Sequence, residues 1–193
     1  YSSEVFFYDY ENLQTLELMG VPIPSYNLRN ADAEGNGFEI EAAWMPGEHW
    51  LLAGNYSWLE TEFTAYDIIP AAGETEADDL TGEPRADSPE HKYTLSAQYS
   101  WPLAQNGELV GRVDYTWADD RIAPSRGEVE DYGLANARLS WFSRDEEWEV
   151  ALWGTNLADE EVLTVFGNGE AVNSTPAWRI PPRMWGVDLV YNL

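Results

Sequence analysis

Apolar and polar side chains alternate strictly along this chain in repeated segments of about ten residues. In the clearest segment, 92–101, the odd-numbered positions are apolar and the even-numbered positions are polar. Successive side chains of a β-strand point to opposite faces, so this pattern predicts a strand with one apolar and one polar face. About ten residues is also the length that a tilted strand needs to cross the hydrocarbon layer of a membrane.

Further segments show the same alternation, namely 38–44, 50–58, 108–117, 135–141, 148–152 and 184–193. Their apolar positions carry no charged residue. A first strand near 4–12 is poorly phased, because the four residues from Val5 to Tyr8 are all apolar or aromatic; we predict that Phe6, Tyr8 and Tyr10 point outward. The sequence thus predicts an all-β protein of about eight antiparallel strands.

The predicted connections between these strands are of two kinds. Short turns occupy 45–48, 102–107 and 143–146, whereas long loops occupy 15–36, 61–90, 118–131 and 158–181. Short periplasmic turns at one end and long extracellular loops at the other are typical of outer-membrane β-barrels. A transmembrane helix is excluded, because no stretch approaches the roughly 18 consecutive apolar residues that it requires.

Aromatic residues support a membrane-spanning sheet. The 10 Trp and 11 Tyr gather at strand ends, where amphipathic rings prefer the two membrane–water interfaces. Beside the short turns, the predicted outward positions are Trp44, Trp50, Trp101, Trp141, Trp148 and Tyr191. Beside the long loops they are Tyr56, Trp58, Tyr93, Tyr115, Trp117 and Trp185. A soluble β-sandwich has no reason to place its Trp at strand ends rather than in the middle of its core.

The last three strands contain a recurrent pattern. It consists of the segment 148–159 (WEVALWGTNLAD), the element Arg179-Ile180-Pro181-Pro182-Arg183 and a terminal alternating strand. This resembles the C-terminal end of a TonB-dependent outer-membrane receptor, and 30–41 and 55–63 are similar to other segments of that barrel. The resemblance implies an open arc, about eight strands of a barrel of roughly 22. The plug domain, the TonB-contacting segment and the earlier strands would then lie outside this chain.

The resemblance also implies function, location and partners. Such a receptor imports a ferric siderophore or another large scarce solute across the outer membrane of a Gram-negative bacterium, with energy delivered through the TonB complex, and catalyses no reaction. The last strand would carry the signal read by the barrel-assembly machinery. Its alternating residues are Trp185, Val187, Leu189, Tyr191 and Leu193. The family usually ends in Phe, whereas this chain ends in Leu193.

Candidate functional residues fall into two groups. On the polar faces, charged residues are expected to face the lumen and to form cross-strand ion pairs or line a solute path. They are Glu39, Glu41, Lys92, Glu108, Arg112, Asp114, Arg138, Glu149 and Asp188. In the long loops, guanidinium and indole groups suit anionic or aromatic chelates. The predicted ligand-binding residues are Arg121, Arg126, Trp178 and Arg179.

Charge and composition narrow the remaining classes. The net charge of -25 would repel a phosphate backbone, so nucleic acid is not expected as a partner. The segment 60–90 holds ten acidic residues against Arg85. Hard cations such as calcium favour oxygen ligands, although acidic runs in loops are more often simply solvated. With no Cys and two His, a transition-metal site is not expected. The sequence has no Gly-x-Ser-x-Gly motif, so a hydrolase is not expected, and no cofactor is predicted.

Two other folds remain open at this point. A complete small barrel of eight strands, with a structural or adhesion role, would pair its first strand with its last. A soluble β-sandwich or lectin-like binding module would bury the aromatic faces against a second sheet.

Overall fold

The computed structural model describes residues 1–19, 25–66, 79–123, 127–166 and 177–192, which form one long antiparallel sheet and two small hairpins. The sheet has the order β1-β2-β3-β4-β5-β8-β9-β12. Its strands are β1 (Ser2–Met19), β2 (Ser25–Trp44), β3 (Trp50–Tyr66), β4 (His91–Pro102), β5 (Glu108–Ala118), β8 (Tyr132–Phe142), β9 (Trp148–Thr155) and β12 (Met184–Tyr191). The hairpins pair β6 (Arg121–Ile122) with β7 (Glu128–Val129), and β10 (Leu163–Phe166) with β11 (Ala177–Arg179).

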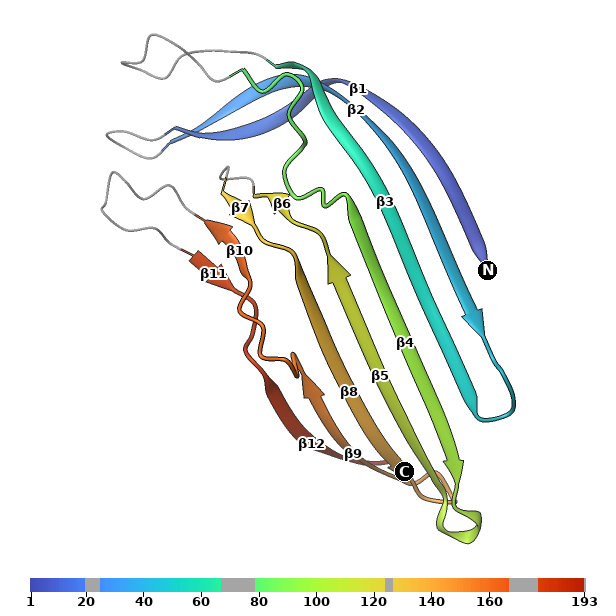
Figure 1. Cartoon of the computed structure of the whole chain (residues 1–193). Helices are drawn as coiled ribbons and strands as arrows, with labels where there is room; N and C mark the ends of the chain where they lie inside the picture. The colour runs from blue at the N-terminus through green and yellow to red at the C-terminus, as the bar shows by residue number, and fades with distance from the viewer. Residues whose placement is uncertain (20–24, 67–78, 124–126, 167–176, 193) are drawn as a thin grey trace.

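The sheet is an open, curved arc (Figure 1). Strand β1 pairs with β2 and strand β12 pairs with β9, so the two end strands lie at opposite edges and do not meet. The eight-stranded arc agrees with the prediction, and the closed barrel of eight strands is wrong. The β-sandwich is also wrong, because no second sheet covers either face in the described part of the chain. No helix among these residues is long and apolar enough to cross a membrane.

The short connections lie at one end of the sheet and the long ones at the other, as predicted (Figure 1). The short ones are 45–49, 103–107 with the 3-10 turn η1 (Ala104–Asn106), and 143–147. Gly107 has a φ of 90°, and a Cβ there would lie 1.9 Å from the backbone oxygen of Phe142. This tight turn therefore requires glycine.

The strands near the N-terminus are longer than predicted. Residues 15–36 were expected to be a loop, but β1 continues to Met19 and β2 begins at Ser25; β3 likewise runs to Tyr66 instead of ending before Thr61. A β-bulge near Tyr10 and another near Asp32 shift the register of these extensions. In these extensions the backbone pairing continues although the strict apolar alternation does not, so the sequence pattern ended before the strands did.

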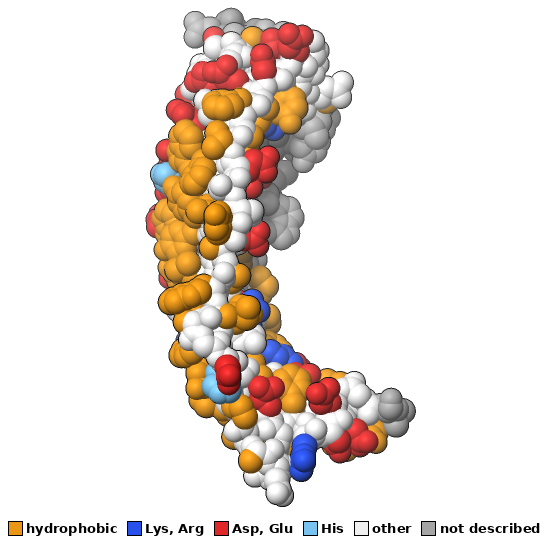
Figure 2. Space-filling model, turned by 90° about the vertical axis from the view of Figure 1, so that its right-hand side faces the viewer, with side chains coloured by type: hydrophobic (Ala, Val, Ile, Leu, Met, Phe, Trp, Pro, Cys, Tyr) orange, Lys and Arg blue, Asp and Glu red, His pale blue; other side chains and the backbone are white. Residues whose placement is uncertain are grey.

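The two faces of the sheet have opposite character. Hydrophobic side chains gather along the convex side, whereas charged side chains project from the concave side and the two ends (Figure 2). Leu95, Val113, Leu152 and Leu189 on the convex face are 53–67% exposed. Water contact with such a side chain costs about 1.5–3 kcal/mol relative to burial, so this face is suited to hydrocarbon.

The outward phase predicted for β1 is wrong. Val5 pairs with Phe38, which places Val5 and Phe7 on the convex face. Phe6 and Tyr8 pair with Gly37 and Gly35 and therefore lie on the concave face, as does Tyr10. The physical reason is space: a ring on β1 fits over a glycine of β2, and the sequence of β1 alone does not contain that information.

Candidate functional site

The concave face carries all nine charged residues that were predicted to face the lumen. The pairing register of the strands places these nine residues on the same face. The pairs that establish this are Glu39↔Ser57, Glu41↔Asn55, Ser57↔Lys92, Gln98↔Arg112, Ser96↔Asp114, Pro102↔Glu108, Arg112↔Arg138, Phe142↔Glu149 and Ala151↔Asp188. Whether this face lines a lumen remains a prediction. What the structure adds is how the charges are arranged on it.

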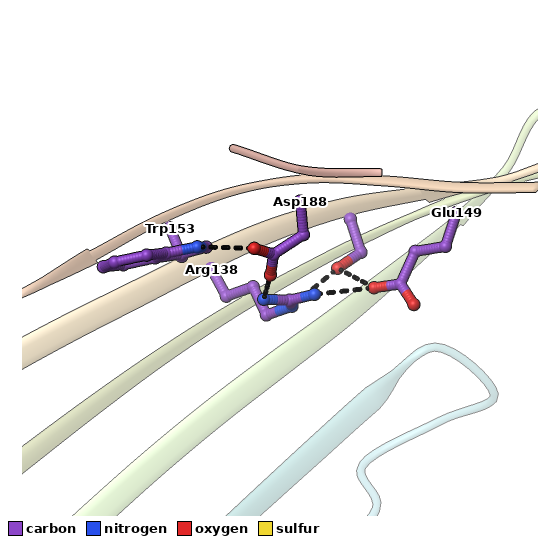
Figure 3. Close-up of polar contacts among 5 residues, drawn as sticks. Arg138, Glu149, Trp153 and Asp188 are labelled. Atoms are coloured by element: carbon purple, nitrogen blue, oxygen red, sulfur yellow. Dashed lines mark hydrogen bonds and ion pairs between the residues drawn. The ribbon is translucent and has the colours of Figure 1, made fainter. Parts of the chain in front are cut away.

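Arg138 of β8 forms the centre of an ionic cluster that joins three strands (Figure 3). Its Nη1 donates to Asp188 of β12 at 2.7 Å, and its Nη2 donates to Glu149 of β9 at 2.8 Å. Its Nε donates to the hydroxyl of Ser140 at 3.0 Å, and that hydroxyl donates to Glu149 at 3.1 Å. The planar guanidinium thus donates to one carboxylate from β9, the adjacent strand, and to one from β12, the strand beyond it.

Trp153 of β9 completes this cluster and was not singled out from the sequence. Its indole N–H donates to Asp188 at 3.0 Å, and its ring fills the space above Gly186 of β12, where a Cβ would lie 2.6 Å from a ring atom. The alternation could have predicted its position: Trp153 lies two residues after Ala151 and four after Glu149, so all three side chains share the polar face of the strand.

The other charged groups described here on the concave face are not linked across strands. Arg112 bonds Asp114 two residues away on the same strand, with a shortest distance of 2.7 Å, so this pair joins no strands. Glu4 of β1 lies directly opposite Glu39 of β2. Like charges in that position destabilise a sheet.

The predicted ligand-binding residues are spread over two loop hairpins. Arg121 in β6 is largely buried, donates to Asp87 at 3.3 Å and lies 5.7 Å from the ring centroid of Tyr132. Its Nη1 is buried without a hydrogen-bond partner in the described residues. Arg179 in β11 is exposed and bonds Glu161 at 2.5 Å.

Two of these predictions lie beyond what the structure describes. Arg126 falls outside the described residues, and Trp178 lies in β11 with its side chain outside them. The two hairpins do pack together, around a buried cluster of Ala123, Val129 and Val162. No contact between the side chains of Arg121 and Arg179 is seen, so their role in ligand binding remains a prediction.

The two sequence motifs near the C-terminus meet in space. Asn156 is buried, accepts a hydrogen bond from the backbone N–H of Glu160 at 2.9 Å and donates to the backbone oxygen of Pro181 at 3.2 Å. Asp159 accepts hydrogen bonds from the backbone and the guanidinium of Arg183 at 2.9 and 3.4 Å. Together these bonds link the segment after β9 to the segment before β12, so the two motifs are in direct contact.

The aromatic residues predicted as membrane girdles all lie on the convex face. Cross-strand partners that share this face include Tyr56↔Tyr93, Tyr93↔Trp117, Trp141↔Leu109, Trp148↔Tyr191 and Trp185↔Gly154. The residues are Trp44, Trp50, Tyr56, Trp58, Tyr93, Trp101, Tyr115, Trp117, Trp141, Trp148, Trp185 and Tyr191. On β12, Trp185, Val187, Leu189 and Tyr191 are 48–77% exposed on that face; Leu193 lies outside the described residues.

A shallow apolar hollow of about 900 Å³ also lies on the convex face. Small side chains such as Ala97 and Ala137 contribute to its floor, and Trp50, Trp101 and Trp185 border it. A large apolar pocket is ordinarily the first candidate for a ligand site. Here it lies among the girdle residues on the face suited to hydrocarbon, and it includes none of the predicted ligand-binding residues.

Carboxylates mark the sheet beyond the girdle on the long-loop side. Asp9, Glu34 and Glu62 lie side by side across β1, β2 and β3. A hydrogen bond with the Glu62 carboxyl, and repulsion by Glu62 and Asp9, raise the pKa of Glu34 above its ordinary value. In the loop, the hydroxyl and backbone N–H of Thr81 lower the pKa of Asp79.

Calcium binding by the acidic segment 60–90 remains a prediction. No group of three or more His, Asp or Glu residues is arranged to hold a metal ion within the described ranges. Residues 67–78 of the segment lie outside them.

Comparison with known proteins identifies the family. The family described as "TonB dependent receptor-like, beta-barrel" matches residues 1–157. The chain belongs to this family. Its members are outer-membrane receptors and transporters of Gram-negative bacteria rather than enzymes. No curated protein sequence matches the chain significantly.

Solved structures share the fold over the whole chain. The siderophore receptor PiuA from Acinetobacter baumannii matches with a TM-score of 0.73 at 16% identity, covering 98% of this chain and 25% of that one. The ferric yersiniabactin uptake receptor FyuA from Yersinia pestis matches with 0.74 at 16%, covering 98% and 27%. BauA, the ferric preacinetobactin receptor from Acinetobacter baumannii, matches with 0.60 at 18%, covering 98% and 26%. The chain thus spans about a quarter of each of these receptors.

Proposed function

We propose that this chain is the C-terminal part of the barrel wall of a TonB-dependent receptor that takes up a ferric siderophore or a similar large scarce solute. The supporting observation is the open eight-stranded arc with an apolar convex face and a charged concave face. An arc with two unpaired edges needs further strands beside β1 and β12 to satisfy its backbone hydrogen bonds in a membrane. The proposed whole is a barrel of roughly 22 strands around a plug.

The proposed orientation follows from the loops. The long loops would face the outside of the cell and the short turns the periplasm. The loop hairpins that carry Arg121 and Arg179 would meet the solute, and the plug, outside this chain, would contact TonB. The concave charges would face the plug and the solute path, and the convex residues of β12 would be read by the barrel-assembly machinery.

The three named receptors support the substrate class, since each is described as a receptor for a siderophore or a ferric chelate. No catalytic step is proposed. On the concave face, Arg138 bonds both Glu149 and Asp188 across strands, which suits a structural role rather than chemistry.

Disruption of the gene in its host tests the proposal. Wild-type, gene-disrupted and TonB-deficient cells would be compared for uptake of a panel of radioactive ferric siderophores under iron limitation. We expect the disrupted and the TonB-deficient strains to lose uptake of the same chelate. Unchanged uptake of every chelate in the disrupted strain would contradict siderophore import, and uptake that needs the gene but not TonB would contradict the energy coupling.

A further inference from the structure

Three aromatic rings of β1 form a row on the concave face at the long-loop end of the sheet. The ring centroids of Phe6 and Tyr8 lie 6.3 Å apart with planes within 9° of parallel. Those of Tyr8 and Tyr10 lie 5.0 Å apart. Phe6 lies opposite Gly37, and the next residue of β2, Phe38, pairs with Trp58 of the girdle beside the long loops. Tyr8 and Tyr10 therefore lie beyond the boundary of the proposed membrane-spanning part. We call this long-loop end of the sheet the mouth.

Two glycines of β2 hold the rings in place. The ring of Phe6 fills the space above Gly37, where a Cβ would lie 2.1 Å from its nearest atom. Tyr8 does the same above Gly35, at 2.3 Å. The rings remain partly exposed, and Tyr10 is 47% exposed. Side chains that are already ordered lose little further entropy when a solute stacks on them.

A cation already lies against one end of the row. The guanidinium carbon of Arg85 is 5.8 Å from the ring centroid of Tyr10. The backbone N–H of Arg85 is held by the hydroxyl of Thr61 at 3.2 Å, so the loop is anchored to β3 at this point. The negative face of an aromatic ring attracts cations, and Arg85 shows that the geometry of the row permits such a contact.

The charge around the mouth has one predominant sign. Among the residues whose side chains the structure describes, the stretches 9–36, 60–91, 118–131 and 156–183, at the long-loop end, hold 18 acidic residues and four basic ones. A field of this sign attracts cations to the mouth and repels anions.

We propose that the Phe6–Tyr8–Tyr10 row is a stacking surface for the ring of a positively charged solute. The inference rests on the proposed function and narrows it: the imported solute would carry an aromatic ring and a net positive charge, rather than the negative charge of a carboxylate- or catecholate-rich chelate. The rings provide the site, and the acidic mouth selects the charge.

Packing over glycine is not in itself a sign of a ligand. On the convex face, Tyr115 lies over Gly133 in the same way. The test must therefore distinguish a binding surface from a purely structural ring, and selectivity for charge does so.

The complete receptor that contains this chain, purified in detergent, would be tested by saturation-transfer NMR with three small probes of similar ring size. These are benzyltrimethylammonium, benzyl alcohol and benzenesulfonate. We expect the cation to bind most tightly and the anion least. Tyr8→Leu should weaken binding of the cation about fivefold, the equivalent of about 1 kcal/mol, whereas Tyr8→Phe should retain it. Phe7→Leu, on the same strand but the opposite face, is the matched control.

Salt provides a second readout, because 1 M salt screens exposed charges beyond about 3 Å. It should reduce the preference for the cation while leaving ring stacking in place. Equal binding of the three probes, tightest binding of benzenesulfonate, or equal losses in Tyr8→Leu and Phe7→Leu would overturn the inference. None of these outcomes bears on TonB-dependent uptake, and loss of that uptake would leave the binding result unchanged, so the two proposals fail separately.

Discussion

The concave face has two regions that use their side chains in opposite ways. At β8, β9 and β12, Arg138 is surrounded by Ser140 of its own strand, Glu149 of β9 and Asp188 of β12, and it bonds all three. At β1 and β2, aromatic rings lie over glycines and carboxylates stand unpaired opposite one another, as Glu4 does opposite Glu39. In the first region, the closed region, the polar groups are already bonded to one another. In the second, the open region, aromatic rings and carboxylates remain accessible to a solute.

The largest loss of stability is expected when the ionic cluster around Arg138 is broken. Arg138→Met removes the only basic group of the described cluster and leaves Glu149 and Asp188 without it. Because these side chains are partly exposed, we expect a loss of about 2 kcal/mol in the free energy of unfolding. Urea unfolding in detergent would measure it. Arg112→Met is the control, since its bond to Asp114 joins no strands; an equal loss in both would show that the cross-strand arrangement adds nothing.

A smaller effect is expected at the glycines of the open region. In Gly37→Ala the new Cβ would meet the ring of Phe6, which must move, at a cost of about 1.5 kcal/mol. The double variant with Phe6→Ala should recover part of this loss, and the cycle of urea midpoints measures the coupling. Gly54→Ala is the comparison, since its nearest atom, a methyl carbon of Leu95, lies 3.0 Å away. Additive losses in the cycle would mean that the ring and the glycine do not depend on each other.

Trp153 allows a finer separation of bonding from packing. Trp153→Phe keeps a ring above Gly186 but removes the indole N–H that donates to Asp188. The expected loss is about 1 kcal/mol, the usual net value of one hydrogen bond. Trp153→Leu, which removes the ring as well, should cost more in the same unfolding assay. If both variants lose the same stability, the hydrogen bond accounts for the whole effect and the ring for none.

The smallest effect concerns pH at Glu34, which lies beside Asp9 and Glu62 on the convex face of β1, β2 and β3. The raised pKa of Glu34 means that the folded state favours its protonated form. This contribution is fully present below the ordinary pKa of a glutamate and is lost as pH rises through the raised value. Glu34→Gln should therefore raise the thermal midpoint slightly at pH 7 and leave it unchanged at pH 4. A decrease at pH 7 would show that the carboxylate is stabilising.

Sequence alone determined the pattern of this protein. Period-two alternation assigned Tyr93, Leu95 and Trp101 to one face, and Arg138, Glu149 and Asp188 to the other. It could do so because successive side chains of a strand point to opposite faces of the sheet. Turn lengths separated the two ends of the sheet in the same way. These are local properties, and each can be read from one segment at a time.

Pairing between strands decided the rest. The phase of β1 depended on Gly35 and Gly37 of its neighbour, since Val5, Phe6, Phe7 and Tyr8 are apolar on both faces. The bond between Trp153 and Asp188 depended on the register of β9 against β12. Register brings together side chains that are far apart in the chain, and only the folded sheet determines which of them meet.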